Sequence, residues 1–237
     1  MKKVGHVIIM GALLLFTLPA SNALALVNPG FETGDTTGWD EVGRVAVRDF
    51  FQGTFPPPDG DNLAMISTNT RPGNSMPAAS LASLESFLGV DLNAVLGIDD
   101  LNDGSAIKQS YTTTGDSIQH MDLAFAFRTG DPTYNDAFFV LIDGQLEAMF
   151  RLSDVIGDMT HNAGNFGVTD YLPLDIAVSA GLHELAIGVV NVDSGRGRSV
   201  LLVDSVLVDS VLPEPATAAL AFMSIGALMF SSWRRRP

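Results

Sequence analysis

Asp204 is the residue whose type and position say most about chemistry. It lies in the apolar segment 199–211, where strict alternation along a strand would put it on one face with Val200, Leu202, Val206 and Val208. Burying an unpaired carboxylate is costly or forces the group to take up a proton, so we expect a cationic partner beside it. The alternative is an exposed aspartate in a strand of different register. Asp204 is therefore the first candidate for a bound cation.

The residue types that usually perform catalysis are not arranged for it. His120, His161 and His183 are isolated from one another, the chain has no cysteine, and no spacing typical of a zinc site occurs. His183 and Glu184 are neighbours in an expected strand, so their side chains point to opposite faces. Neither a Gly-x-Ser-x-Gly elbow nor a phosphate-binding Gly-x-x-x-x-Gly-Lys loop is present. These observations do not favour an enzyme.

Two acid-rich stretches could hold calcium by composition, namely 59–61 and 99–104. Neither fits the EF-hand loop, which needs oxygen ligands at alternating positions and a glutamate at the end, and Leu101 breaks the alternation. We expect both stretches to be solvated turns.

The charge is distributed unevenly along the chain. The formal net charge is −14, from 13 basic and 27 acidic residues, but five of the basic residues lie at the two ends and only one acid, Glu214, lies beyond residue 212. The body, residues 26–212, therefore has a net charge of −18 and contains one lysine, Lys108. This excludes a nucleic-acid binder, because phosphate neutralisation needs clustered Lys and Arg.

The first 25 residues have the three parts of a secretory signal peptide. Lys2 and Lys3 form the basic start, an apolar stretch follows over 7–18, and Ala23-Leu24-Ala25 supplies small residues where signal peptidase cleaves. We expect export with cleavage after Ala25, and we expect no disulfides to assist stability, since there is no cysteine.

The C-terminal segment, residues 213–237, contains three features in a fixed order. Pro213, Glu214 and Pro215 are followed by an uncharged run over 216–233 and then by the basic end Arg234, Arg235 and Arg236. Eighteen helical residues at 1.5 Å each span about 27 Å, which is enough for a bilayer core. The terminal arginines would keep that end in the cytoplasm.

These three features together resemble the PEP-CTERM sorting tail. The resemblance implies a transient inner-membrane anchor that a membrane-embedded exosortase cleaves near Pro213, Glu214 and Pro215, which releases the protein to the cell surface of a Gram-negative bacterium. It also implies an association with exopolysaccharide, and it gives these three residues a role in processing and none in catalysis.

The body has the pattern of a β protein. Short alternating segments occur between Gly, Asp, Asn and Pro clusters, and Met121, Leu123, Phe125 and Phe127 form one face of a strand. The dipeptide Asp143-Gly144 predicts a hairpin. We expect strands at 44–51, 62–67, 107–112, 121–128, 137–143, 145–150, 182–192 and 199–211, and a helix at 78–89 capped by Ser80 and Gly89.

The predicted fold is all-β: an antiparallel β-sandwich of jelly-roll type with one inserted short helix, plus an N-terminal signal helix and a C-terminal transmembrane helix. The predicted domains are the signal peptide (1–25), the sandwich (26–212) and the sorting tail (213–237).

Two stretches of the body carry further resemblances. The segment 28–32 (NPGFE), followed by Gly38-Trp39, is similar to the opening of β-sandwich carbohydrate-binding modules. That resemblance implies a structural calcium ion that joins Glu32 on the first strand to Asp204 on the last, and it implies that the aromatic residues pack under the first turn. The segments 104–107, 134–139, 152–155 and 200–206 resemble the body of many exosortase-sorted proteins, which implies fold and export and no assigned chemistry.

The sequence is compatible with three functions. The first is an exported surface or matrix protein with a structural or adhesive role in exopolysaccharide, processed by signal peptidase and exosortase. The second is a carbohydrate-binding module with structural calcium as its one candidate cofactor. The third, a secreted hydrolase, has the least support, because 26 acids in the body make paired carboxylates inevitable and uninformative.

Overall fold

The computed structural model describes residues 25–68, 77–128, 136–155, 158–192 and 199–210. The sorting motif 213–215, the arginines 234–236 and all of the expected signal peptide except Ala25 lie outside these residues, so the expectations for both ends stay predictions. Among the described residues, no helix is long and apolar enough to cross a membrane.

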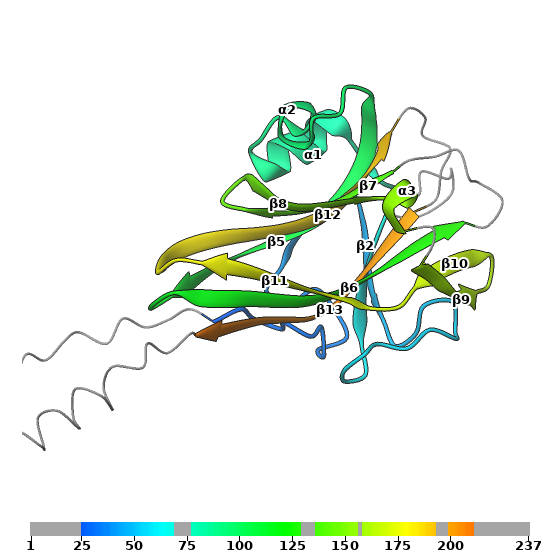
Figure 1. The fold of residues 1–237 in the computed structure, drawn as a ribbon, viewed down its shortest axis with the longest axis horizontal. Coiled ribbons are helices and arrows are strands. Elements are labelled where there is room, and N and C mark those ends of the chain that lie inside the picture. Colours follow the sequence, from blue (N-terminus) through cyan, green and yellow to red (C-terminus); the bar gives the residue numbers. More distant parts are fainter. Residues whose placement is uncertain (1–24, 69–76, 129–135, 156–157, 193–198, 211–237) are drawn as a thin grey trace, which may run out of the picture.

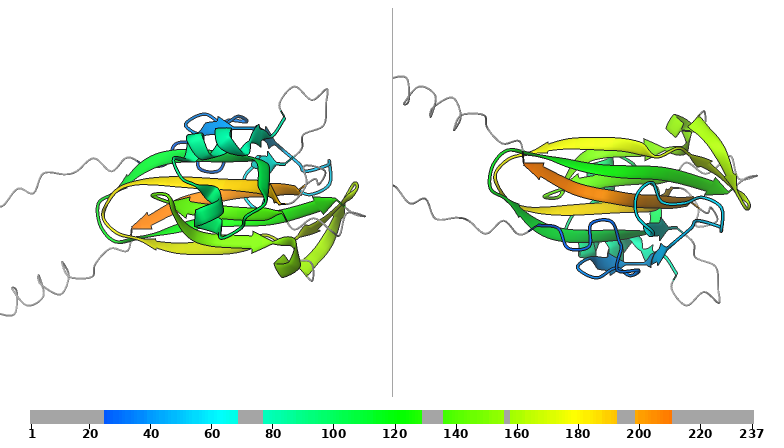
Figure 2. Two further views of the ribbon diagram at one scale, coloured as in Figure 1. Left: turned by 90° about the horizontal axis from the view of Figure 1, so that it is seen from above. Right: turned by 90° about the horizontal axis from the view of Figure 1, so that it is seen from below.

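The described chain forms two antiparallel sheets stacked face to face, which confirms the predicted β-sandwich (Figures 1 and 2). The first sheet has the order β1 (Asp40–Val42), β5 (Leu101–Thr113), β12 (Gly181–Val192), β7 (Ala137–Ile142) and β8 (Gln145–Arg151), with β4 (Ala79–Ser80) also paired to β5. The second has the order β2 (Arg44–Arg48), β3 (Leu63–Ser67), β13 (Ser199–Ser210), β6 (Ser117–Arg128), β10 (Phe166–Thr169) and β9 (Met159–Ala163), with β11 (Leu172–Val178) paired to β6.

The main core lies between the two sheets and comes from alternate residues of the long strands. The expected face of β6 is confirmed, since Met121, Leu123, Phe125 and Phe127 are all buried in this core. The hairpin at Asp143-Gly144 is also confirmed: φ is 54° and 74° at the two turn residues, and β7 pairs directly with β8.

The outer face of the first sheet is covered by two short helices, where the sequence predicted one. Helix α1 (Leu81–Leu88) begins at the N-cap Ser80 and ends at Gly89 (φ 72°), as expected. A second helix, α2 (Leu92–Leu96), follows at once with Asp91 as its N-cap. Periodicity missed α2 because five residues are too few to show a helical repeat. A third short helix, α3 (Leu152–Val155), follows β8.

The outer face of the second sheet is covered by a loop. Phe51 and Phe55 pair through an isolated bridge and are buried over Ala124 and Ala126 of β6, whose side chains point away from the main core. Phe50, by contrast, remains 46% exposed. The sandwich therefore has hydrophobic contacts on both outer faces, which explains why many of its strands are apolar on both sides.

The acid-rich stretch 99–104 is only partly a turn, which corrects our expectation. Strand β5 begins at Leu101 and runs to Thr113, so Asn102, Asp103 and Gly104 are strand residues. Gly104 is required there, because a Cβ would lie 2.4 Å from the carbonyl oxygen of Val189 on the neighbouring strand. Turn composition misled the prediction because β12 supplies a pairing partner that local sequence does not reveal.

The closing strand β13 contains an irregularity that corrects the predicted face of its second half. Val200 and Leu202 lie on the outer face with Asp204, as expected, but Val206 and Val208 point into the main core. The pairing of β13 with β6 shifts between Asp204 and Leu207, and Ser205 has φ of 53°. The bulge reverses the alternation of side chains. Even-numbered residues therefore lie on the outer face before it and point into the main core after it.

Candidate functional site

Glu32 and Asp204 both lie close to the backbone at Gly30. A Cβ on Gly30 would lie 3.6 Å from Asp204 Oδ1 and 3.6 Å from Glu32 Cγ. Both residues line one pocket of about 490 Å³, together with Asn28, Thr33 and Asp59 among others. The N-terminal loop is fixed to the closing strand at this point, because the Val206 amide donates to the Pro29 carbonyl at 3.1 Å. The two residues expected to cooperate are thus brought together.

The turn 59–62 supplies backbone donors to both carboxylates. The amide of Asp59 donates to Asp204 Oδ2 at 3.3 Å, and the amides of Asp61 and Asn62 donate to the two carboxylate oxygens of Glu32 at 2.9 and 3.1 Å. Gly60 is required in this turn, since it has φ of 63° and a Cβ would lie 2.3 Å from Glu32 Oε1. This turn is exposed as expected, and its role as an anion-binding loop was not predicted from the sequence.

Asp204 is a buried acid with no basic side chain to neutralise it. It is 1% exposed, and among the described residues neither it nor Glu32 forms an ion pair with Lys, Arg or His. Burial raises the pKa of Asp204 to about 7, with the nearby carboxylates of Glu32 and Asp59 adding to the effect and hydrogen bonds from Ser205 and Asp59 opposing it. At neutral pH, either a proton or a bound cation would therefore stabilise this buried carboxyl group by neutralising its charge.

The donor set at this position has the chemistry that calcium prefers. Its side-chain donors are carboxylate oxygens, which are hard ligands, and both carboxylates keep lone pairs beyond those that accept the backbone hydrogen bonds. The described residues contain no group of three or more His, Cys, Asp or Glu side chains placed to hold a metal. Any further ligands to an ion here would therefore have to be carbonyl oxygens or water.

A second buried acid, Asp136, lies where β7 begins. It is fully buried and accepts hydrogen bonds from Thr68 Oγ1 at 3.3 Å and from the Val192 amide at 3.4 Å. Burial raises its pKa to about 6, although hydrogen bonds from Ser199, Val192 and Thr68 oppose the shift. Sequence reasoning missed this site because Asn135 precedes it, and an Asn-Asp dipeptide is typical of an exposed turn.

Each of the three histidines of the described body pairs with an aspartate. His120 Nδ1 lies 2.6 Å from Asp175, and His161 Nε2 lies 2.5 Å from Asp170. Both ring nitrogens of His183 face acceptors, because Nδ1 lies 2.8 Å from Asp143 Oδ2 and Nε2 lies 2.9 Å from the Ser179 carbonyl.

Two acceptors around the His183 imidazole favour its doubly protonated, charged form. Burial lowers the pKa of His183, but the hydrogen bonds to Asp143 and Ser179 outweigh burial and raise it. These pairs join strands and do not contact the Glu32 and Asp204 pocket, whose lining contains no histidine.

The aromatic residues of the opening motif lie in the core. Phe31 is fully buried, Trp39 is 5% exposed, and their ring centroids lie 5.5 Å apart, as the opening motif predicted. Trp39 Nε1 donates to the Asn28 carbonyl at 3.2 Å. Trp39 therefore shapes the loop that holds Glu32 and is not available to stack on a ligand.

No known protein family and no curated protein matches this sequence. Solved structures that are similar include TmCBM61 in complex with β-1,4-galactotriose (10% identity, 78% of this chain, 97% of that chain, TM-score 0.40). Another is the CBM22-1 xylan-binding domain from Paenibacillus barcinonensis Xyn10C (12% identity, 80% of this chain, 97% of that chain, TM-score 0.35). A third is the enzymatically active domain of tailspike protein 4 from bacteriophage CBA120 (10% identity, 78% of this chain, 21% of that chain, TM-score 0.36). Likenesses this distant do not identify an activity, so function is argued from the chain's own residues.

Asp204 should make the stability of the metal-free protein fall as pH rises. Its folded pKa (about 7) lies above its unfolded value (3.8), so its contribution is fully present below about pH 4 and is lost as pH rises through about 7. The measurement is the melting temperature in chelator from about pH 4 to 8, for the natural protein and for Asp204→Asn. The variant should show a flatter decline above about pH 5, because its amide does not titrate.

The exposed Asp100→Asn serves as the matched control and should keep the natural slope. Asp204→Asn also loses a hydrogen-bond acceptor, which shifts its melting temperature by a similar amount at every pH. The readout is therefore the slope of melting temperature against pH. Equal slopes for the natural protein and Asp204→Asn would show that Asp204 does not carry this proton.

Proposed function

We propose that this chain is an exported, non-enzymatic protein of the cell surface or extracellular matrix, whose β-sandwich binds polysaccharide and holds a structural calcium ion between Glu32 and Asp204. The observation that carries the proposal is the convergence of these two carboxylates, from the N-terminal loop and the closing strand, in one pocket. The motifs at the two ends of the sequence support the export and sorting part of the proposal.

The side chains of the pocket suit sugar hydroxyl groups. Asn28 and Thr33 are held in place by the loop, since the Asn28 amide donates to the Asp35 carbonyl at 2.9 Å and the Thr33 hydroxyl donates to Asp35 Oδ1 at 2.7 Å. Carboxylates such as Asp59 accept hydrogen bonds from hydroxyls, and Leu207, 46% exposed at the pocket edge, offers an apolar contact for a sugar ring. Such a pocket recognises hydroxyls by fixed polar groups without aromatic stacking.

The net charge of the body narrows the class of polysaccharide. A body charge of −18 repels anionic polymers, so we propose a neutral glycan as the ligand. Calcium would neutralise the buried carboxylates and hold the N-terminal loop against β13. Glu32 and Asp204 are the residues that would bind it, and turn 59–62 orients both of them through its backbone amides.

The non-enzymatic part of the proposal follows from what the described residues bring together. None of the three His and Asp pairs lines the pocket. His120 also lies 3.7 Å from a second acid, Asp122, but the imidazole stands between the two carboxylates, which is not the arrangement of a Ser-His-Asp triad or of a glycosidase carboxylate pair. The proposed role in adhesion or matrix structure requires the sandwich to bind polysaccharide and does not require it to catalyse a reaction.

The two ends of the chain give the proposed route. Signal peptidase would remove residues 1–25, the apolar run 216–233 would hold the chain in the inner membrane, and an exosortase would cleave near Pro213, Glu214 and Pro215. The described sheets extend from Asp40 to Ser210, so they would remain intact after both cleavages.

Calcium should raise the melting temperature of residues 26–212, because a ligand that binds only the folded state stabilises it. At pH 8 and a calcium concentration about 100 times the Kd, the gain is about 2.7 kcal/mol. Glu32→Gln should lose most of this response, whereas the exposed control Glu147→Gln should keep it. Identical melting in calcium and in chelator would refute the metal site.

Residues 26–212 should bind a neutral polysaccharide in a glycan array or pull-down assay. Asp59→Ala removes one carboxylate from the pocket and should weaken binding about three- to tenfold, the effect of one or two hydrogen bonds. Asp100→Ala, exposed and outside the pocket, is the matched control. Absence of glycan binding, or an equal loss in both variants, would count against this pocket as the sugar site.

Replacing Pro213 and Pro215 by Ala in the full chain should leave the protein in the membrane fraction of its host, because the cleavage motif would be destroyed. The exposed loop substitution Pro58→Ala should leave release unchanged. Cell fractionation with immunodetection measures the outcome. Normal release of the doubly substituted protein would contradict the sorting proposal and leave the sugar-binding proposal to its own test.

A further inference from the structure

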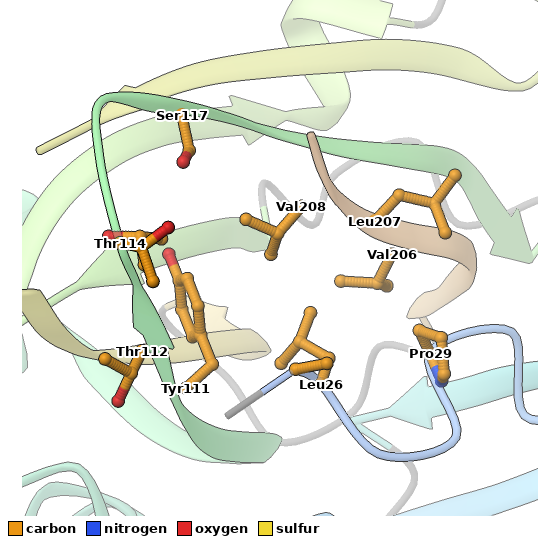
Figure 3. Close-up of a pocket in the computed structure, with 11 residues that line it drawn as sticks. Leu26, Pro29, Tyr111, Thr112, Thr114, Ser117, Val206, Leu207 and Val208 are labelled. Atoms are coloured by element: carbon orange, nitrogen blue, oxygen red, sulfur yellow. The ribbon is translucent and has the colours of Figure 1, made fainter. Parts of the chain in front are cut away.

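A second pocket, of about 370 Å³, lies at the end of the sandwich where the described chain begins and ends (Figure 3). It is enclosed by the incoming segment at Leu26, the end of β13 and the tip of the β5–β6 hairpin. Its volume falls within the range of small-molecule sites. The residues that line it are Ala25, Leu26, Pro29, Tyr111, Thr112, Thr113, Thr114, Ser117, Val206, Leu207 and Val208.

The space between the sheets changes character toward this end. In the middle of the sandwich the inward-facing positions are apolar, but along β5 and β6 they become polar near the hairpin. By alternation with core residues, the inward-facing polar side chains are Gln109, Tyr111, Thr113, Ser117 and Gln119, and every one of them is buried. A buried polar group is costly unless it finds a partner, so the groups here that lack one are the candidates to meet a ligand.

Most of these polar groups have partners, and two of their atoms do not. The Thr113 hydroxyl donates to the Ser179 carbonyl at 2.6 Å, and the Ser117 hydroxyl donates to the Gly115 carbonyl at 3.0 Å. Among the described residues, the Tyr111 hydroxyl and Gln119 Oε1 are buried without a hydrogen-bond partner. The Gln119 amide nitrogen donates to the carbonyl of Leu207, a lining residue, at 2.7 Å.

The Tyr111 hydroxyl is the group best placed to meet a ligand. Its residue is 1% exposed, and Figure 3 shows its ring directed into the pocket, with the aliphatic side chains of Leu26, Val206 and Val208 around the same space. Burial, together with the Asp143 carboxylate, raises the pKa of Tyr111 to about 12, so the phenol stays neutral under ordinary conditions. A buried phenol of this kind donates one hydrogen bond to an oxygen acceptor.

The lining selects against charge and against a fully hydroxylated ligand. None of the lining residues is Asp, Glu, Lys, Arg or His, so in the chain that still carries Ala25, before the proposed cleavage, an ionic head group would lose its hydration without compensation. The hydroxyls of Thr113 and Ser117 already donate to backbone carbonyls, and the lining between the hydroxyl-bearing residues is aliphatic, so a sugar would find fewer partners than it has hydroxyls. An aliphatic body that ends in one neutral oxygen group matches both properties.

We propose that this pocket binds a small neutral aliphatic molecule that ends in a hydroxyl group, with the ligand oxygen hydrogen-bonded to the Tyr111 hydroxyl and the aliphatic body against Leu26, Val206 and Val208. This site is separate from the proposed sugar pocket, with which it shares only Pro29 and Leu207. The two pockets differ in their chemistry, since one is lined by carboxylates and the other by hydroxyls and aliphatic groups.

Octanol is the probe, and isothermal calorimetry and melting temperature are the measurements. The protein used comprises residues 21–212, which contain all the described sheets. It begins at Ser21 so that the charged amino terminus is not at Leu26, which lines the pocket. Octanol should bind and raise the melting temperature. Octanoate tests the requirement for neutrality and glucose tests the requirement for an aliphatic body, and both should bind at least tenfold more weakly.

Three variants locate the site. Tyr111→Phe should weaken octanol binding about three- to tenfold, the effect of one neutral hydrogen bond, without lowering the melting temperature of the free protein, since the hydroxyl has no protein partner to lose. Val208→Phe, at a half-buried position on the pocket wall, should fill the pocket and abolish binding. Tyr171→Phe is the matched control, because its hydroxyl bonds to the Pro56 carbonyl and lies outside the pocket.

The proposal is overturned if octanol does not bind, if octanoate or glucose binds as well as octanol, or if Tyr111→Phe and Tyr171→Phe lose the same affinity. A Val208→Phe protein that melts like the natural chain and still binds octanol would also overturn it. A protein that binds octanol but no glycan would refute the proposed function and leave this site intact.

Discussion

A carboxyl group buried in the closing strand is the constraint on which much of this structure depends. Asp204 is almost fully buried on the outer face of its sheet, and the bulge at Ser205 that follows it turns Val206 and Val208 into the core. The N-terminal loop then bonds to β13 beyond the bulge, and turn 59–62 supplies amides to Asp204 and Glu32. Three segments that are distant in the sequence therefore meet around one acid, and a proton or a cation must balance it.

Several other acids of the body have side-chain partners, whereas Asp204 accepts hydrogen bonds from backbone amides. His120, His161 and His183 each contact an aspartate, and Asp136 is satisfied by hydroxyl and amide donors where β7 begins. The raised pKa values of Asp204, Asp136 and His183 all favour the folded state at lower pH. A protein without cysteine and with this balance would be stabilised by protons or by cations from its surroundings.

Two pockets of different chemistry adjoin at the end of the sandwich where the described chain begins and ends. Pro29 and Leu207 separate them, and both residues border the bulge or the loop that the bulge holds. The acidic pocket exists because Asp204 is turned away from the core, and the hydroxyl-lined pocket exists because Val206 and Val208 are turned toward it. One backbone irregularity thus creates both surfaces, which links the fold directly to the proposed binding functions.

Local sequence patterns predicted most of the central strands and their turns. Alternation identified β6, β7, β8, β12 and most of β13, and cap residues identified α1, because these signals depend on neighbours within a few positions. The strands β9, β10 and β11 were not predicted, because β9 is mostly polar, β10 has only four residues and β11 contains Pro173. They pair with β6 or with each other only in the folded chain. The pairing of Glu32 with Asp204 followed from a family resemblance, and the turn that binds both carboxylates was not predicted.

By itself, the sequence determined the β class, the acidic body, the absence of disulfides and the export and sorting signals proposed for the two ends. The tertiary structure decided which acids are buried, which face each half of β13 presents, and that Tyr111 lies at a pocket without a partner for its hydroxyl. The physical reason is that the alternation of apolar and polar residues in a sequence indicates only which residues of a regular strand share a face. Burial and hydrogen bonding depend on segments that a bulge or a loop brings together over long separations in the chain.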